Sequence, residues 1–251
     1  MADSRFQAQE LIFDAMESGD EQKAAQLCRR ALEIYPDCVD AMNMLADLEC
    51  ERLDEYVEAK RRAVEAGRRD LGPAVFEQEK GYFWGMIETR PFMRAMAGLA
   101  DALLQCGQPE HVDKAIEIYE EMLELNPNDN QGIRDPLVSC YLQRKRYGEA
   151  ADLLQRYEED DMATFAWARV LLAYATEGPE AATKPLERAR DDNIHVELYL
   201  TGKKRRPKHR PSAYSPGDES EAIFCADNLW EAYKKHPKAK RWLKEVCAEE
   251  P

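Results

Sequence analysis

The sequence lacks the usual signals of catalysis. Its four histidines do not form HExxH and do not stand at metal-ligand spacing from a cysteine: His111, His195, His209 and His236. It also has no GxSxG, GxGxxG or GxxxxGK(S/T) motif, so the common hydrolase, dinucleotide and phosphate-loop signatures are missing. We therefore expect that the protein is not an enzyme and uses no cofactor and no metal.

Paired cysteines and long apolar runs are missing too. The 7 cysteines form no CxxC pair, and most stand among apolar positions where a free thiol behaves as a small hydrophobe. The longest apolar stretch, ARVLLAYA, contains Arg169 and is far too short to span a bilayer. The first residues, MADSRFQAQE, lack the basic start and apolar run of a signal peptide. These features predict a soluble, cytoplasmic protein in a reduced compartment.

Positive net charge is absent from the chain as a whole. The formal charge is -14, and 33% of the residues are charged. Such a balance repels phosphates on average, which makes nucleic acid an unlikely partner and gives no reason to expect membrane binding. It favours solubility and basic partners.

What the sequence has instead is a repeated pair of helices. In residues 5–38, Gly19-Asp20 marks a turn between two helical patterns, Ala24 and Ala31 recur seven residues apart, and Pro36 ends the second helix. The same register predicts four further helical hairpins, at residues 39–67, 93–129, 131–158 and 164–196. Strand signals are nearly absent. We therefore predict an all-α fold.

Prolines mark the boundaries between the predicted hairpins. Asn126-Pro127 is predicted to stop one helix, because the residue before proline is pushed out of helical space. Asp129 or Asn130 is then available to cap the next helix. Pro136 fits only in the first turn of that helix and would kink it elsewhere. Hairpins of this kind bury a shared core when they stack side by side.

Residues 67–92 are too long for an ordinary connection and are rich in aromatic rings. One interpretation is an extra helix or loop whose rings complete the core. The other is an aromatic platform on the binding surface, formed by Tyr82, Phe83 and Trp84.

The first helix of each stacked hairpin is expected to line a concave groove. Projection of the repeat register onto this face predicts partner-binding residues at Phe6, Gln9, Phe13, Asp40, Asn43, Asp47, Arg94, Ala97, Asp101 and Leu104. In the later hairpins the same projection places Ser139, Phe165, Ala168 and Leu172 on this face. The set is apolar with acidic positions, which suits a protein or peptide with apolar anchors and basic residues.

A basic run interrupts the acidic chain at residues 202–211, GKKRRPKHRP. Its charges come from Lys203, Lys204, Arg205, Arg206, Lys208 and Arg210. Its prolines predict an extended loop, at residues 201–216. Three interpretations stay open: a connector that docks on the acidic body, a contact for nucleic acid or another acidic surface, and a transport signal. Residues 217–251 then predict two helices that cap the repeats.

Two stretches carry a family resemblance. GYFWGMIETRPFMRAMAGLADALLQCG, followed by LELNPNDNQGIR, resembles uncharacterised bacterial tetratricopeptide repeat (TPR) proteins. The end of the chain resembles the C-terminal region of the suppressor of tumorigenicity 7 family, on His195-Val196, Tyr199-Leu200, Gly217-Asp218, residues 220–223 and Trp230. The resemblance implies a TPR-like fold and provides no catalytic residues.

Together these observations predict an α-solenoid over residues 1–200, followed by the basic loop and the capping helices. The function we expect is that of a non-enzymatic scaffold or adaptor, which holds a protein or peptide in its concave groove. The alternative is a nucleic-acid- or ribosome-associated factor that uses residues 203–210.

Overall fold

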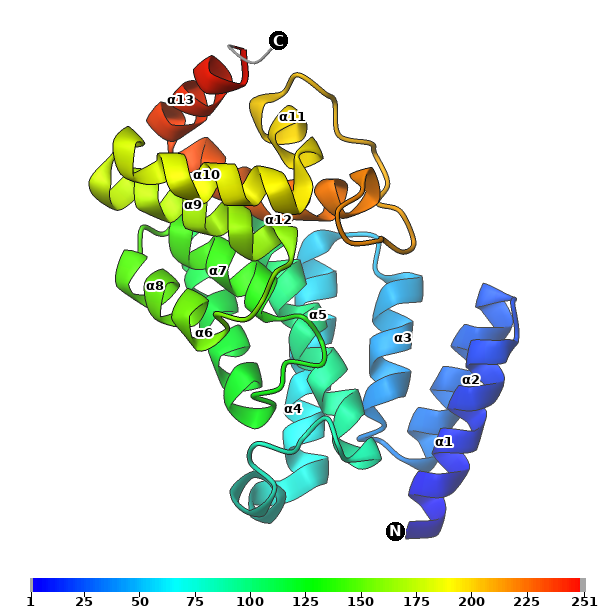
Figure 1. The fold of residues 1–251 in the computed structure, drawn as a ribbon. Coiled ribbons are helices and arrows are strands. Elements are labelled where there is room, and N and C mark those ends of the chain that lie inside the picture. Colours follow the sequence, from blue (N-terminus) through cyan, green and yellow to red (C-terminus); the bar gives the residue numbers. More distant parts are fainter. Residues whose placement is uncertain (1, 249–251) are drawn as a thin grey trace. The chain divides into compact units, whose positions relative to one another are not determined.

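The computed structural model describes residues 2–248 and contains thirteen α-helices and one short 3₁₀ helix, with no β-strand in that range (Figure 1). The prediction of an all-α fold is confirmed. The helices divide into two compact units, residues 1–133 and 134–251. This division differs from the predicted one, whose boundaries lay at residues 200 and 216.

Unit 1 contains three antiparallel helix pairs. The first helices of the pairs are α1 (Ala2–Glu17), α3 (Val39–Glu49) and α5 (Arg90–Cys106), and the second helices are α2 (Glu21–Ile34), α4 (Leu53–Gln78) and α6 (Pro109–Leu125). Each second helix packs against its own first helix, and α2 and α4 also pack against the first helix that follows. The 3₁₀ helix η1 (Ile87–Thr89) leads directly into α5.

Unit 2 contains two more pairs and a C-terminal group of helices. The pairs are α7 (Arg134–Gln143) with α8 (Tyr147–Arg156), and α9 (Ala163–Glu177) with α10 (Pro179–Asn193). The C-terminal group is α11 (His195–Thr201), α12 (Glu219–Lys235) and α13 (Pro237–Ala248). The five predicted hairpins are therefore all present as helix pairs.

The helix ends follow from local chemistry. Gly19 has φ 61°, and the Asp20 side chain caps α2 by accepting a hydrogen bond from the Lys23 amide at 3.0 Å. Helix α6 ends just before Asn126-Pro127, as predicted. Pro136 falls in the first turn of α7, the one place where its missing N–H costs nothing. These local rules explain why the hairpin boundaries were predictable.

The stretch between the second and third hairpins forms an aromatic core rather than a long loop. Helix α4 runs on to Gln78 through a kink at Gly72-Pro73, where Gly72 has φ 70°. Phe76, Phe83 and Phe92 then pack together, with ring centroids 5.1–6.3 Å apart.

Helix α12 lies across the first helices of unit 2. It packs against α7, α9 and α11, and it buries Cys225, Leu229 and Tyr233 almost completely. The Tyr233 hydroxyl donates to the Trp167 carbonyl at 3.0 Å, and the Ser139 hydroxyl donates to the Asn228 carbonyl. Since Ser139 is a predicted groove position, α12 occupies the face that was expected to be open in this unit.

Candidate binding face

The candidate site is the side of unit 1 that presents α1, α3 and α5, which we call the inner face. The ten predicted groove residues lie on these three helices at matching repeat positions, as in Phe6, Asp40 and Arg94. Gln9 of α1 and Asp40 of α3 line the same small pocket, so the surfaces of the first two hairpins adjoin there. The helix pairs therefore bring residues far apart in the sequence to one surface.

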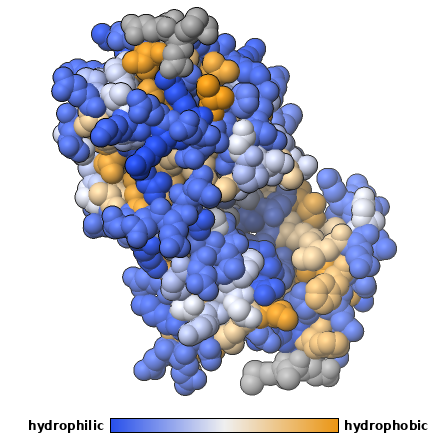
Figure 2. Space-filling view, viewed as in Figure 1, coloured by the Kyte–Doolittle hydropathy of each residue, from blue (hydrophilic) through white to orange (hydrophobic). Residues whose placement is uncertain are grey.

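Large apolar side chains are exposed along α1. Phe6, Phe13 and Met16 have exposed fractions of 64%, 56% and 55%. The opposite side of the helix carries Ala8 and Ile12, which are buried in the core shared with α2. Figure 2 shows hydrophobic colours gathered over the N-terminal helices. Large apolar side chains grouped on a surface mark interaction sites more often than single exposed ones do.

Beside this apolar strip lies an ion pair that joins the second and third hairpins. Arg94 donates from Nη2 to both carboxylate oxygens of Asp40, at 2.8 and 2.9 Å. Asp40 is only 6% exposed, whereas Arg94 is largely open to solvent. The carboxylate predicted as an acidic groove position therefore already has a cationic partner.

A buried lysine, Lys60 of α4, satisfies a second inner-face carboxylate. Its Nζ lies 2.7 Å from the Asp47 carboxylate and donates to the Asn43 carbonyl at 3.2 Å. Its stem lies over Gly98, where an added Cβ would approach the chain to 3.3 Å. Asp47 also accepts a hydrogen bond from the Tyr56 hydroxyl at 2.7 Å, and burial together with this bond raises the pKa of Tyr56.

The remaining predicted positions are only partly available. Asp101 is exposed and accepts a hydrogen bond from the Tyr119 hydroxyl at 2.6 Å. Gln9, Ala97 and Leu104 are half-buried, and Asn43 is buried. The inner face thus offers an apolar strip on α1 and a polar floor on α3 and α5, in which Asp40, Asp47 and Asp101 are hydrogen-bonded and the buried Oδ1 of Asn43 has no partner among the described residues.

The three rings of the predicted aromatic platform do not share one surface. Phe83 is fully buried and belongs to the core of unit 1, which corrects its assignment to a platform. Trp84 is half-buried, and Arg90 lies over its ring at 5.4 Å. Tyr82 is exposed. The reason is the backbone: the amides of Gly81 and Phe83 donate to the Leu125 carbonyl and draw this stretch onto the end of α6.

The basic loop of residues 203–210 docks largely on its own unit. Lys203 donates to the Cys247 carbonyl at 2.6 Å, and Lys204 pairs with Glu219. Arg206 and Arg210 both pair with Asp227, at 2.6 and 2.8 Å. Four of the six predicted contact residues therefore have intramolecular partners, and Arg205 and Lys208 are exposed.

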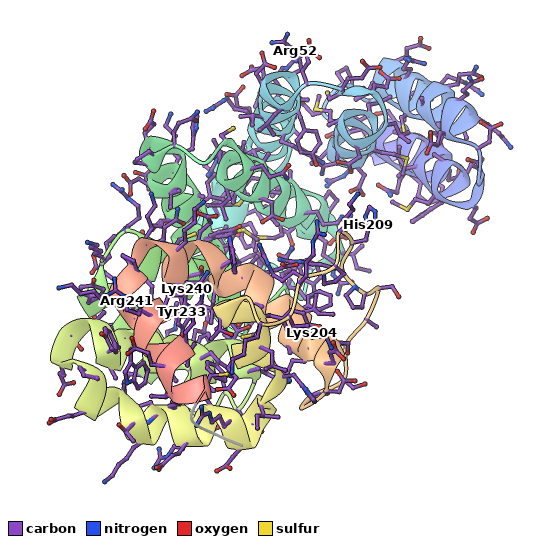
Figure 3. All side chains as sticks on the ribbon, turned by 90° about the horizontal axis from the view of Figure 1, so that it is seen from above. Arg52, Lys204, His209, Tyr233, Lys240 and Arg241 are labelled. Atoms are coloured by element: carbon purple, nitrogen blue, oxygen red, sulfur yellow. The ribbon has the colours of Figure 1, made fainter. Side chains whose placement is uncertain are left out.

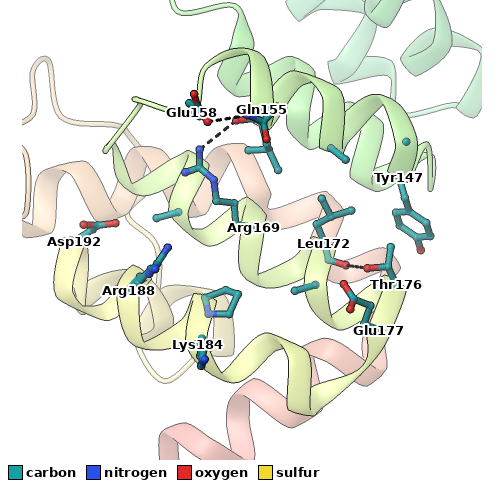
Figure 4. Close-up of a pocket in the computed structure, with 16 residues that line it drawn as sticks. Tyr147, Gln155, Glu158, Arg169, Leu172, Thr176, Glu177, Lys184, Arg188 and Asp192 are labelled. Carbon is teal, nitrogen blue, oxygen red and sulfur yellow. Dashed lines mark hydrogen bonds between the residues drawn. The ribbon is translucent and has the colours of Figure 1, made fainter.

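Unit 2 has a separate cleft of about 920 Å³ between α8, α9 and α10 (Figure 4). Leu172, a predicted groove residue, lines this cleft, whereas Phe165 and Ala168 are fully buried. The charged lining is balanced between three cations and three carboxylates: Arg169, Lys184, Arg188, Glu158, Glu177 and Asp192. The lining contains no Ser, Cys or His.

Thiol chemistry is also disfavoured by the surroundings of the buried cysteines. Burial raises the pKa of Cys28 to about 11 and raises the pKa of Cys225 as well. Within residues 2–248, no cluster of three or more His, Cys, Asp or Glu could hold a metal ion. In the same range no helix has the length and apolar character needed to cross a membrane.

Comparison with known proteins places this architecture among helical repeats. Residues 110–174 match the family model of the tetratricopeptide repeat. A solved structure, described as YrrB, a TPR protein with an unusual peptide-binding site, is similar over 72% of this chain and 84% of its own. The TM-score is 0.51 and the sequence identity 19%, so the likeness shows the TPR fold. No curated protein matches the chain. None of these matches carries the predicted resemblance to the suppressor of tumorigenicity 7 family.

Two features of the site could not be read from the sequence. Lys60 lies on the second helix of its hairpin, and projection of first helices alone omits it. The position of α12 over α7 and α9 was also missed. The apolar spacing of α12 indicated that it needed a partner surface but did not indicate which one.

Proposed function

We propose that the protein is a non-enzymatic interaction scaffold, and that the inner face of unit 1 binds a peptide segment of a partner protein. The observation that carries the proposal is the exposed strip of Phe6, Phe13 and Met16 on the face where repeats of this fold present their first helices. Apolar anchors supply most of the affinity in such interfaces. The peptide-binding site named for YrrB supports the same class of function.

The charges of the inner face indicate the character of the partner. Three carboxylates, those of Asp40, Asp47 and Asp101, belong to this face, and Arg94 and Lys60 pair with the first two. A segment with apolar anchors and a basic residue is complementary to this arrangement. Because most of these groups are already paired, charge serves orientation, and the anchors on α1 supply the affinity.

A random peptide library displayed on phage, selected against the full chain, tests the proposal. Selected peptides should share apolar anchors near a Lys or Arg. Phe13→Asp should weaken their binding by at least about tenfold, because it places a charge at the centre of the apolar strip. Fluorescence polarisation with the synthesised peptides measures the change.

The matched control is Ile194→Asp, which changes an apolar side chain of similar exposure, 51%, in unit 2. This variant should bind the peptides normally. Equal loss in both variants, or no enrichment over an unrelated target protein, would contradict the proposal.

A further inference from the structure

Positive charge is concentrated in two short segments of this acidic chain. Residues 203–210 and 234–244 each contain six Lys or Arg and no Asp or Glu. These twelve are drawn from 35 basic residues in total, and the net charge of -14 less twelve positive charges leaves -26 on the rest. The overall charge therefore conceals a strongly basic region, and potentials at a surface follow local charge rather than the total.

The fold brings the two segments together around Trp230. The Arg206 guanidinium lies 4.1 Å from the centroid of the Trp230 ring, and Lys240 Nζ of α13 lies 3.7 Å from it. Lys203 is bonded to the carbonyl of Cys247 on α13. Loop and helix thus form one basic surface, and Figure 3 labels Lys240 and Arg241 on α13 and Lys204 and His209 on the loop.

Helix α13 contributes a basic side opposite its buried side. Ala239, Leu243 and Cys247 are buried, whereas the solvent side carries Lys238, Arg241 and Lys244, with Glu245 at its end. The pKa of Lys240 is lowered by burial and by the nearby charges of Lys244, Arg206 and Lys234, with Glu231 acting against them. Cations of the loop and of α13 therefore lie close enough to act on one another.

Half of the twelve cations make no ion pair, side-chain hydrogen bond or ring contact among the described residues. They are all exposed: Arg205, Lys208, Lys235, Lys238, Arg241 and Lys244. The surface also lacks a large apolar anchor, since the exposed apolar side chains of unit 2, Ile194 and Tyr214, lie outside both segments. A protein partner usually needs such an anchor. A chain of phosphates does not, because its binding is driven by the release of counterions.

We propose that the loop 203–210 and helix α13 form one composite surface that binds the phosphate backbone of a nucleic acid. Recognition is independent of base sequence, because Trp230 is covered by Arg206 and Lys240 and is not free to stack on a base. The surface differs from the inner face of unit 1 in residues and in chemistry, so the two proposals stand or fall separately.

Fluorescence polarisation with a short labelled oligouridylate tests this surface. With six free cations, log K should fall with log salt at a slope of about -4. Changing all six to Gln should weaken binding at least about tenfold and flatten the slope. Changing only Lys238, Arg241 and Lys244, or only Arg205 and Lys208, should each give part of this loss. Circular dichroism confirms that each variant is folded.

The control removes the same number of charges from exposed positions in unit 1: Lys23, Arg29, Arg30, Arg52, Arg62 and Lys114 (Arg52 is labelled in Figure 3). Its binding should stay within about twofold of the wild type. Three results would overturn the proposal: equal loss in the control, no loss in the α13 variant, or equally tight binding of an oligoglutamate peptide of the same charge.

Discussion

In both units the first helices of the hairpins form one side of the unit. This side is open in unit 1 and is covered by a helix in unit 2. In unit 1 the inner face, made by α1, α3 and α5, leaves Phe6, Phe13 and Met16 of α1 open to solvent. In unit 2, the corresponding side of α7 and α9 is covered by α12, whose Leu229 and Tyr233 are almost fully buried. Repeat register therefore determines which side of a hairpin is available, whereas distant chain segments determine whether that side is occupied.

The filled face of unit 2 also shows what kind of segment a face made of first helices accepts. Helix α12 packs its apolar side against α7 and α9. Hydrogen bonds such as that from the Ser139 hydroxyl to the Asn228 carbonyl add to this packing. Glu221 at its start accepts a hydrogen bond from the Ala163 amide at 3.0 Å. Unit 2 thus contains an internal example of a segment held by apolar anchors and oriented by polar contacts.

The largest effect should come from truncating the segment that fills unit 2. Leu229→Ala removes a fully buried side chain and should lower the free energy of unfolding of unit 2 by about 2–5 kcal/mol, through lost burial and the cavity left behind. Hydrogen exchange resolved by segment measures this. The amides of α7, α9 and α12 should exchange faster, and those of α3 and α5 should not change.

The paired variant for this test is Phe13→Ala on the open face. Because Phe13 is 56% exposed, its removal should change stability by no more than about 0.5 kcal/mol. If Leu229→Ala cost no more than Phe13→Ala, α12 would not be part of the core of unit 2, and the contrast between the two faces would fail.

An intermediate effect should come from the contact between the second and third hairpins of unit 1. A Cβ added to Gly67 of α4 would lie 2.7 Å from a ring carbon of the buried Phe92. Gly67→Ala should therefore destabilise unit 1 by about 1–3 kcal/mol despite the better helix propensity of alanine. Urea unfolding followed by circular dichroism measures the change.

Gly148→Ala in α8 is the matched control, because nothing lies within 4 Å of the added Cβ. The free energy of unfolding of this variant should rise by up to about 1 kcal/mol, from the better helix propensity of alanine alone. A neutral or stabilising Gly67→Ala would mean that the second and third hairpins do not depend on this close approach.

The fold was predictable wherever a boundary depends on neighbours in the sequence. Gly19-Asp20, Asn126-Pro127 and Pro136 act through local sterics and hydrogen bonds, and each stands where the pattern placed it. The kink at Gly72-Pro73 within α4 was not predicted, because packing of Phe76 against Phe92 holds the helix together beyond it.

The positions of the candidate residues on their helices could be read from the sequence, but their ion pairs could not. The register placed Phe6 and Phe13 on the inner face, but it could not show that Arg94 neutralises Asp40 or that Lys60 reaches Asp47. These pairs join different hairpins, and their geometry depends on how the helices stack. Of the basic surface, the sequence indicated only the loop. The cations of α13 lie beside the loop because Arg206 and Lys240 both contact the ring of Trp230.

The smallest effect concerns the pH dependence of unit 2 where α12 meets α13. His236 is buried, with Nδ1 2.7 Å from the Ala232 carbonyl and Nε2 2.8 Å from the Tyr147 hydroxyl. Burial, with help from Lys145, lowers the pKa of His236 below its usual value. The unfolded chain therefore binds this proton more readily, so stability is full above about pH 6.5 and is lost as the pH falls through the folded pKa.

Urea unfolding at a series of pH values between about 7 and 5 measures this contribution, whose slope is at most about 1.4 kcal/mol per pH unit for one proton. His236→Gln cannot take up the proton, so its stability should depend less on pH over this range even if the variant is less stable overall. His209→Gln, in the exposed part of the basic loop, should keep the wild-type dependence. An unchanged slope in His236→Gln would mean that protonation of His236 does not loosen α12, and that the filled face of unit 2 withstands acid through its apolar packing.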